Sequence, residues 1–440
     1  MTVIELGLRE HEPEAEPSRP SRARQFRTAL AVVAVLLVGL AAGSAPPVRP
    51  RLTEIAVVPT APAYRHVLAD GVLYSLGAQY GETSRTLSAH DLRDGSVRWQ
   101  VPAGDNILGR AGLWVNLFLQ VDGDWVLLNN ADSTIGVDTA TGRTLWTARH
   151  RIIPTGTDGI GYSSRPVLAG GDGAPVVAPI GDYPEEDLRV LLRGFDLGTG
   201  TELWVSPPVR SGEALPGVDG ALLVVTAENR AEVWDARTGA ARQRITGPGV
   251  RTRAVTSGGG QIYVTDETST LTAYAADTLE RRWRVPVPHS NGEGIPCGRY
   301  VCYWQPPTEG PGRGSTILLD AADGRPVGAM VDGWLAEESG GHLIKRDENG
   351  VPVHTVDPAT GRTLIDLTGW PDPVWSDERS PLLLRRSGDG PRQWFGVLEQ
   401  GDTRVSLLGS VPHQSYRCQS SATHVACQTA PEELRVWRYR

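Results

Sequence analysis

The sequence predicts an all-β protein built from a repeated unit of about four short strands, and three observations predict it. Past residue 50, short alternating runs such as GVLYSLGA, ALLVVTA and QIYVTDE are separated by Gly, Asp, Asn and Pro. A pattern of Asp, Gly and often Trp returns roughly every 37–58 residues. The chain has 13 Trp but only 4 Phe, which indicates a repeated structural position for Trp. A period near 40–45 residues with about four strands is typical of a β-propeller blade.

The first element in the chain is a predicted membrane anchor. Residues 1–27 are polar, and residues 28–45 then read TALAVVAVLLVGLAAGSA. About 17 apolar or small residues without a charge are near the lower limit for a membrane span. Arg22, Arg24 and Arg27 lie directly before this run, which holds that side in the cytoplasm and leaves the rest of the chain extracytoplasmic.

Two alternatives to the anchor are a cleavable signal peptide and a buried apolar segment. A signal peptide fits poorly because the polar segment before the apolar run is long. Pro46 and Pro47 also follow the best small-residue site, where proline hinders cleavage. We therefore expect a single-pass protein of the cell membrane with these parts: a cytoplasmic tail over 1–27, a transmembrane signal-anchor helix over 28–45, a linker over 46–50, and an extracytoplasmic β-propeller over 51–440.

Each residue type of the repeated motif has a physical role. Asp before a turn accepts hydrogen bonds from backbone N–H groups two or three residues later. Gly supplies the positive φ that lets the hairpin enter the next strand. Trp projects from that strand, packs against the neighbouring unit and directs its indole N–H to an acceptor. The predicted motif residues are Asp91, Gly95, Trp99, Asp138, Gly142, Trp146, Asp196, Gly200, Trp204, Asp235, Gly239, Trp283, Asp320, Gly324, Asp357 and Gly361.

Three copies carry the full set of Asp, Gly and Trp, and two copies lack the Asp. One, which ends at Trp283, has Ala275 at the Asp position, and a worn copy begins at Leu398 with Glu399 there. At the C-terminal end, residues 416–440 offer three strands, and residues 52–59 could add the missing outer strand. We expect this pairing of N- and C-terminal strands to close the ring, because an open strand edge is a liability.

The pattern Asp-x-x-Thr-Gly-x-x-x-Trp resembles the blade motif of pyrroloquinoline-quinone-type repeats. Over residues 51–440 the chain is similar to the quinoprotein-like β-propellers, in a membrane-anchored form. A literal count gives eight units and a composite one, whereas the resemblance implies eight blades. We therefore expect about eight, with seven or nine possible. A WD-repeat propeller is the alternative, because Val-Trp-Asp at 233–235 resembles its dipeptide. Basic charge is almost wholly arginine, Lys345 being the one lysine, which is typical of GC-rich, actinobacterial-type genomes.

Four cysteines form two local pairs, Cys297 with Cys302 and Cys418 with Cys427. Each pair would sit on adjacent strands of a hairpin, within bridging reach. An even count in an exported chain predicts two local disulfides. A four-thiolate zinc site is the alternative, although neither pair has the C-x₂-C spacing and the pairs lie more than about a hundred residues apart.

The quinoprotein resemblance would imply a dehydrogenase with a vicinal Cys-Cys disulfide, a catalytic Asp, and Glu, Asn and Asp ligands to calcium. The sequence has no Cys-Cys pair and no C-x-x-C-H haem signature, so none of these roles can be carried over. The nine His lack metal-ligand spacing, and YPEEDL at 183–188 is a possible calcium loop with a solvated acidic loop as the alternative. We predict no catalytic, cofactor-binding or metal-ligating residue and no cofactor.

The net charge of −8, without a basic face of Arg and interleaved aromatics, argues against nucleic acid as a partner. Three inserts, 103–130, 151–192 and 303–316, are the expected contact surfaces, because loops on a rigid scaffold carry binding. Drift in loop length is the alternative.

These features predict a non-enzymatic scaffold, anchored in the cytoplasmic membrane through 28–45, that binds an unknown protein or cell-envelope partner. It resembles the scaffold propellers of outer-membrane-protein assembly in fold only, since no lipobox cysteine lies near the N-terminus. A quinone- or metal-dependent oxidoreductase and the sensor domain of a signalling system are the alternatives.

Overall fold

The computed structural model describes most of the chain beyond the predicted anchor. It covers residues 52–59, 65–78, 85–102, 118–129, 133–156, 158–168, 188–245, 251–288, 293–305, 314–328, 331–332, 335–339, 342–347, 349–374, 382–386, 390, 392–430 and 433–439. These residues all belong to the unit that spans 51–440. Within them, no helix is long and apolar enough to cross a membrane. The predicted tail, span and linker lie outside the described residues.

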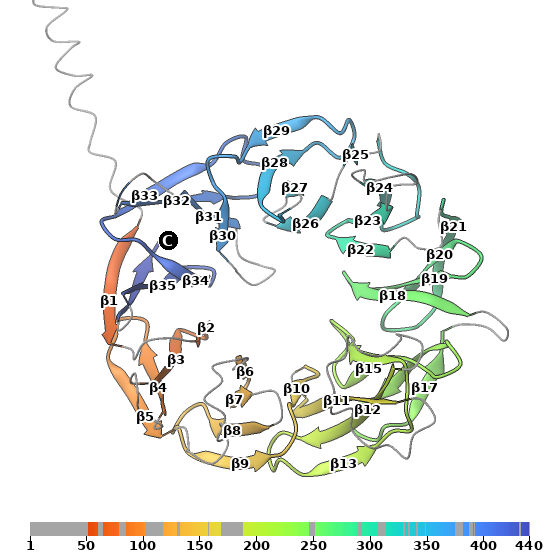
Figure 1. The fold of residues 1–440 in the computed structure, drawn as a ribbon, viewed down its shortest axis with the longest axis horizontal. Coiled ribbons are helices and arrows are strands. Elements are labelled where there is room, and N and C mark those ends of the chain that lie inside the picture. The colour runs from red at the N-terminus through yellow and green to blue at the C-terminus, as the bar shows by residue number, and fades with distance from the viewer. Residues whose placement is uncertain are drawn as a thin grey trace, which may run out of the picture. The chain divides into compact units, whose positions relative to one another are not determined.

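The predicted all-β propeller fold is confirmed, and the described residues form nine antiparallel sheets of four strands each (Figure 1). Eight sheets use four strands that are consecutive in the sequence. The first four are β2 (Arg65–Ala69), β3 (Val72–Ala78), β4 (Arg85–Asp91) and β5 (Val97–Pro102); β6 (Phe118–Asp122), β7 (Trp125–Asn129), β8 (Thr134–Asp138) and β9 (Thr144–Ala148); β10 (Ile153–Pro154), β11 (Ile160–Leu168), β12 (Leu188–Asp196) and β13 (Glu202–Val205); and β14 (Ser211–Ala214), β15 (Ala221–Val225), β16 (Ala231–Asp235) and β17 (Ala241–Arg244).

The next four sheets repeat the same order of strands. They are β18 (Thr252–Gly258), β19 (Gln261–Asp266), β20 (Thr270–Ala275) and β21 (Arg281–Pro286); β22 (Glu293–Cys297), β23 (Tyr300–Gln305), β24 (Ser315–Asp320) and β25 (Val331–Asp332); β26 (Leu335–Ser339), β27 (His342–Arg346), β28 (Pro352–Val356) and β29 (Thr363–Asp366); and β30 (Asp372–Val374), β31 (Leu382–Arg386), β32 (Gln393–Leu398) and β33 (Ser406–Val411).

The ninth sheet combines the two ends of the 51–440 unit. Its strands are β34 (Tyr416–Ser420), β35 (His424–Ala430), β36 (Glu433–Arg438) and β1 (Thr53–Pro59), with β1 paired to β36. The register runs from Thr53 opposite Arg438 to Pro59 opposite Glu433. In Figure 1 the red-orange β1 accordingly lies beside the blue strands of the C-terminal end. With this composite sheet, the described residues form nine sheets. The sequence predicted about eight blades, with seven or nine as alternatives.

Successive sheets pack on one another through clusters of buried apolar side chains. The cluster around Leu128 and Ile135, for example, joins the β2–β5 sheet to the β6–β9 sheet. Further clusters link each later pair of neighbours in chain order. Phe395 and Trp437 lie in the cluster between the β30–β33 sheet and the composite sheet, and Leu73 lies in the cluster between the composite sheet and the β2–β5 sheet. The core is therefore divided among the interfaces between sheets.

Candidate functional site

The Asp of the repeated motif organises the turn between the third and fourth strands of its sheet. Asp138 Oδ1 accepts the Thr141 backbone N–H at 2.7 Å and the Thr141 hydroxyl at 2.6 Å. The Gly142 backbone N–H donates to the Asp138 carbonyl at 2.9 Å. Hydrogen bonds from the hydroxyl and backbone of Thr141 favour the charged carboxylate and lower the pKa of Asp138. Asp196 and Asp235 accept from a threonine three residues later in the same way.

The remaining motif aspartates make shorter-range contacts. The carboxylate oxygens of Asp91, Asp320 and Asp357 each accept the backbone N–H of the residue two positions later. Asp91 also pairs with the guanidinium groups of Arg93 and Arg98, each at 2.8 Å. All these carboxylates are occupied by turn hydrogen bonds, which is a structural role.

The motif glycines are needed both for their backbone conformation and for lack of a side chain. Their φ values lie between 69° and 75° at Gly95, Gly142, Gly200, Gly239, Gly324 and Gly361. A Cβ built on Gly142 would lie 2.5 Å from the Trp99 ring of the preceding sheet, and one built on Gly200 would lie 2.6 Å from Trp146. Trp204 covers Gly239 and Trp283 covers Gly324 in the same manner.

Each motif tryptophan also donates a hydrogen bond to the next sheet. The indole Nε1–H of Trp99 reaches the Thr139 carbonyl at 2.8 Å, and that of Trp146 reaches the Leu197 carbonyl at 2.5 Å. Trp204 and Trp283 donate to Ala236 and Ala321, each at 2.8 Å. Every acceptor directly follows the Asp position of its own motif. The indole therefore joins neighbouring sheets by ring contact and by hydrogen bond, which we call the indole lock.

Sequence reasoning missed the small residue that makes room for each indole within its own sheet. The cross-strand partners of Trp99, Trp146, Trp204 and Trp283 are Ala89, Gly136, Gly194 and Ala273. A Cβ on Gly136 would lie 2.2 Å from the Trp146 ring. The available signal was Gly or Ala two residues before the Asp position in each of the four copies that end in Trp.

The junction between the β14–β17 and β18–β21 sheets has other residues in place of the indole lock. In the β14–β17 sheet, Gln243 pairs with Val233 and so takes the Trp position. The next sheet has Leu279 at the glycine position, with φ 57° and only 9% exposed. Because no indole covers this turn, an apolar side chain fills the space within the cluster of Ile245 and Ile262.

The two predicted disulfides are confirmed. Cys297 and Cys302 are bonded across the β22–β23 hairpin, with Cα atoms 5.7 Å apart. Cys418 and Cys427 are bonded between β34 and β35, with Cα atoms 4.1 Å apart. The sulfur atoms that the zinc alternative requires are therefore all committed to disulfides.

Most of the three predicted contact inserts falls outside the described residues. The structure describes 118–129 of the first insert, 151–168 except 157 and 188–192 of the second, and the strand ends of the third. Of the acidic stretch 183–188, it describes only Leu188. Within the described ranges, no group of three His, Cys, Asp or Glu side chains is placed to hold a metal ion.

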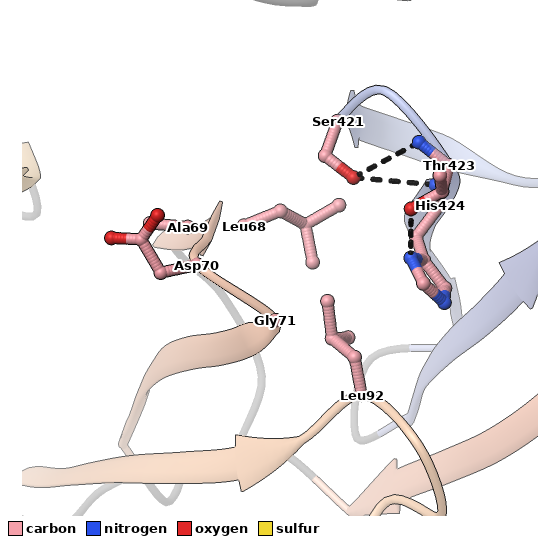
Figure 2. A pocket seen from close by; sticks show the side chains of 8 residues that line it. All are labelled: Leu68, Ala69, Asp70, Gly71, Leu92, Ser421, Thr423 and His424. Atoms are coloured by element: carbon pink, nitrogen blue, oxygen red, sulfur yellow. Dashed lines mark hydrogen bonds between the residues drawn. The ribbon is translucent and has the colours of Figure 1, made fainter.

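A pocket of about 280 Å³ lies between the composite sheet and the β2–β5 sheet, and Figure 2 shows its lining. It is bounded by Leu68, Ala69, Asp70, Gly71, Leu92, Ser421, Thr423 and His424. The β2–β3 and β34–β35 hairpins supply all of these residues except Leu92, which comes from the turn after β4. None of them belongs to the predicted site residues.

His424 forms one wall of this pocket, and its imidazole is held by a neighbour. Its Nδ1 lies 2.7 Å from the Thr423 hydroxyl oxygen, and its backbone N–H donates to the Ser421 hydroxyl at 3.2 Å. Burial and the nearby guanidinium of Arg438 lower the pKa of His424. At neutral pH the ring is therefore mainly uncharged, and the exposed side chain of Asp70 lies at the rim of the pocket.

A comparison of the sequence with known protein families gives a match over residues that carry the repeats. A profile of the family described as outer membrane protein assembly factor BamB matches residues 51–179 and 189–300. The chain belongs to this family. A comparison with curated proteins gives no match.

Solved structures similar to the chain include several propellers of low sequence identity. BamB from Moraxella catarrhalis is 14% identical, with 88% of this chain and 97% of that chain covered at a TM-score of 0.40. The computationally designed Ika8 protein is 16% identical, with 73% and 95% covered at 0.43. The quinohemoprotein alcohol dehydrogenase of Comamonas testosteroni is 12% identical, with 89% and 77% covered at 0.41. No ligand or activity is transferred from structures this distant.

Proposed function

We propose that the protein is a non-enzymatic, membrane-anchored scaffold whose extracytoplasmic propeller binds a protein partner. The observation that carries this proposal is the match of residues 51–179 and 189–300 to a family described as an assembly factor. Assembly factors act through contacts with other proteins, and rigid propellers present loops for such contacts. The predicted span at 28–45 would hold the scaffold at the membrane surface.

The architecture supports a holding role. Indole locks and disulfides fix neighbouring sheets and hairpins, so the loops project from a preorganised frame. A preorganised surface loses little conformational freedom on binding, which favours affinity. The cysteines pair as 297 with 302 and 418 with 427, unlike the vicinal pair expected of a quinone dehydrogenase.

The scaffold proposal is tested by crosslinking in native membranes. The full chain with an affinity tag is crosslinked in cells, and the adducts are purified and identified by mass spectrometry. We expect one or a few envelope proteins in fixed ratio to the bait. The matched control is the same tag on an unrelated single-pass membrane protein; an adduct pattern equal to this control would overturn the proposal.

A second measurement tests the oxidoreductase alternative directly. The purified full chain is incubated with pyrroloquinoline quinone and Ca²⁺, and its unfolding temperature and dye-linked oxidation of alcohols are measured. We expect neither a shift nor turnover. A saturable shift together with turnover would replace the scaffold assignment by the enzyme assignment.

The anchor has its own test. We expect the full chain to stay in the membrane pellet after alkaline carbonate washing and to be degraded by protease added outside spheroplasts. Removal of residues 28–45 should prevent export and protect the chain. A full chain that is released by the wash, or that protease reaches only after lysis, would contradict the anchor.

A further inference from the structure

Two junctions between neighbouring sheets share an Asp-Gly turn together with a leucine that donates its backbone N–H to the turn; the Asp219-Gly220 turn of the β14–β17 sheet has Ala236 in place of the leucine. The first turn of the β2–β5 sheet contains Asp70-Gly71, and the first turn of the β10–β13 sheet contains Asp158-Gly159. Gly71 has φ 74° and Gly159 has φ 71°. The Gly71 carbonyl accepts the Leu92 backbone N–H at 3.0 Å, as the Gly159 carbonyl accepts that of Leu197 at 2.9 Å. The backbone frame, the glycine and the leucine are therefore equivalent.

The two junctions differ in what covers the glycine. Trp125 is the first residue of β7, the second strand of the sheet that precedes Gly159. A Cβ built on Gly159 would lie 3.1 Å from Trp125 Cη2, so the indole lies directly against this turn. Trp125 also packs on the cluster that includes Leu197. The tryptophan thus fills its junction with a side chain of the protein itself.

The corresponding residue at the other junction is His424, the first residue of β35 in the sheet that precedes Gly71. Among the atoms that the structure describes, none lies within 4 Å of a Cβ built on Gly71. The imidazole is smaller than an indole and is drawn aside by Thr423, whose hydroxyl lies 2.7 Å from Nδ1. The pocket of about 280 Å³ is thus the space that Trp125 fills at the equivalent junction.

The lining suits a flat aromatic group. In Figure 2 the side chains of Leu68 and Leu92 point toward each other. His424 lies to one side of this pair and forms another wall of the pocket. Leu92 is only 4% exposed, so the floor is fixed by the core between the two sheets. Aromatic rings pack well against leucine and against the edge or face of an imidazole. The exposed carboxylate of Asp70 at the rim favours a donor or a positive charge beside the ring.

We propose that this pocket receives an aromatic side chain, preferably an indole, from the partner polypeptide that the scaffold holds. The choice of occupant follows from the equivalent junction, where the same glycine and leucine accept Trp125. A buried aromatic anchor in a preformed pocket is the usual centre of a protein interface. This inference rests on the proposed scaffold function, because it identifies where the partner is held.

The first test uses N-acetyltryptophanamide as the probe and the full chain in lipid nanodiscs. Saturation-transfer NMR should show transfer from the wild-type protein to the indole protons. His424→Trp should fill the pocket as Trp125 fills its junction, and the transfer should be lost. Val97→Trp, on the outer strand β5 where Val97 is 55% exposed, adds a tryptophan elsewhere and should leave the transfer unchanged. No transfer to wild type, or equal transfer to His424→Trp, would overturn the proposal.

A reciprocal variant guards against a His424→Trp protein that fails to fold. Trp125→His should open the equivalent junction and create a second pocket, so the probe signal should roughly double in proportion to the number of equivalent sites. Unchanged signal in a Trp125→His protein with wild-type circular dichroism would count against the equivalence of the two junctions.

The partner crosslinking experiment separates this inference from the function on which it rests. If wild type captures a specific partner and His424→Trp loses it, both stand. If His424→Trp captures the partner as well as wild type does, the pocket assignment is overturned and the scaffold function stands. If wild type captures only background, the scaffold function fails together with the partner assignment, whatever the probe shows.

Discussion

The junction between the β14–β17 and β18–β21 sheets, which lacks an indole lock, offers a test of the lock itself. At four other junctions a tryptophan of one sheet covers a glycine of the next, whereas here Gln243 stands at the Trp position and Leu279 at the glycine position. We predict that Gln243→Trp combined with Leu279→Gly rebuilds the lock. The new indole would lie on the glycine, and its N–H would reach the carbonyl of Ala276, which directly follows the Asp position.

The magnitudes follow from the burial of these two residues. Gln243→Trp alone forces an indole against a side chain that is 91% buried, which costs about 1–3 kcal/mol by overpacking. Leu279→Gly alone removes a leucine from a packed cluster at about 2–5 kcal/mol, partly offset by about 1–2 kcal/mol from relief of the left-handed backbone. The double variant should unfold within about 1 kcal/mol of wild type, whereas the single variants together cost about 4 kcal/mol at the middle of these ranges, so the coupling free energy is about 3 kcal/mol.

Urea unfolding of the full chain, followed by far-ultraviolet circular dichroism, measures the four free energies of this cycle. The control cycle combines Gln243→Trp with Leu364→Gly, a residue 57% exposed on β29, and should be additive. The opposite result is a Gln243→Trp/Leu279→Gly double variant that changes the free energy of unfolding by the sum of the two single changes. That result would show that contact with an indole is not the reason why these turns contain glycine.

Three further changes test other parts of the structure. Trp146→Ala removes a side chain only 7% exposed and should lower the free energy of unfolding by about 3–5 kcal/mol in urea titrations, while Val97→Ala should change it by less than about 0.5 kcal/mol. Replacing both Cys297 and Cys302 by Ala should cost about 2–3 kcal/mol in the same assay, because the bond closes a short loop; unchanged stability would refute this. Burial lowers the pKa of His90 below 6.5, so the imidazole takes up a proton more readily in the unfolded chain than in the folded protein. The free energy of unfolding should therefore fall as the pH drops below about 6.5, and His90→Gln should make this pH dependence less steep. An equally steep pH dependence in the variant would contradict this prediction.

The fold could be predicted because the turns between its strands are specified by residues close together in the sequence. The turn at Asp138 and Gly142 needs only residues within a few positions, and such turns recur in recognisable form. The role of Trp146 also followed from its place in the repeat, although its acceptor, the Leu197 carbonyl, lies 51 residues further on. The small residues opposite each indole lie on the strand before the turn, and their role depends on the cross-strand pairing with the Trp, which the turn motif does not specify.

The pocket could not be predicted from the sequence. His424 reads as an isolated strand residue, and its importance depends on the absence of an indole at a junction formed by strands far apart in the chain. Gly71 and Gly159 have the same local sequence, Asp-Gly, and differ only in what the preceding sheet places above them. Differences of this kind arise from packing between sheets, which a local pattern does not encode.

The pairing of β1 with β36 has a consequence for synthesis of the chain. Arg435 Nη1 lies 2.8 Å from Glu54 Oε2, and 381 residues separate the two in sequence. Strand β1 therefore emerges from the ribosome first and finds its hydrogen-bonding partner only when nearly all later strands have been made. During that interval its edge is open to other chains, since non-local pairing forms late and exposed edges aggregate. A nascent chain should accordingly depend on a holding factor until β36 arrives, and ribosome stalling shortly before residue 433 should be more harmful than stalling between complete sheets.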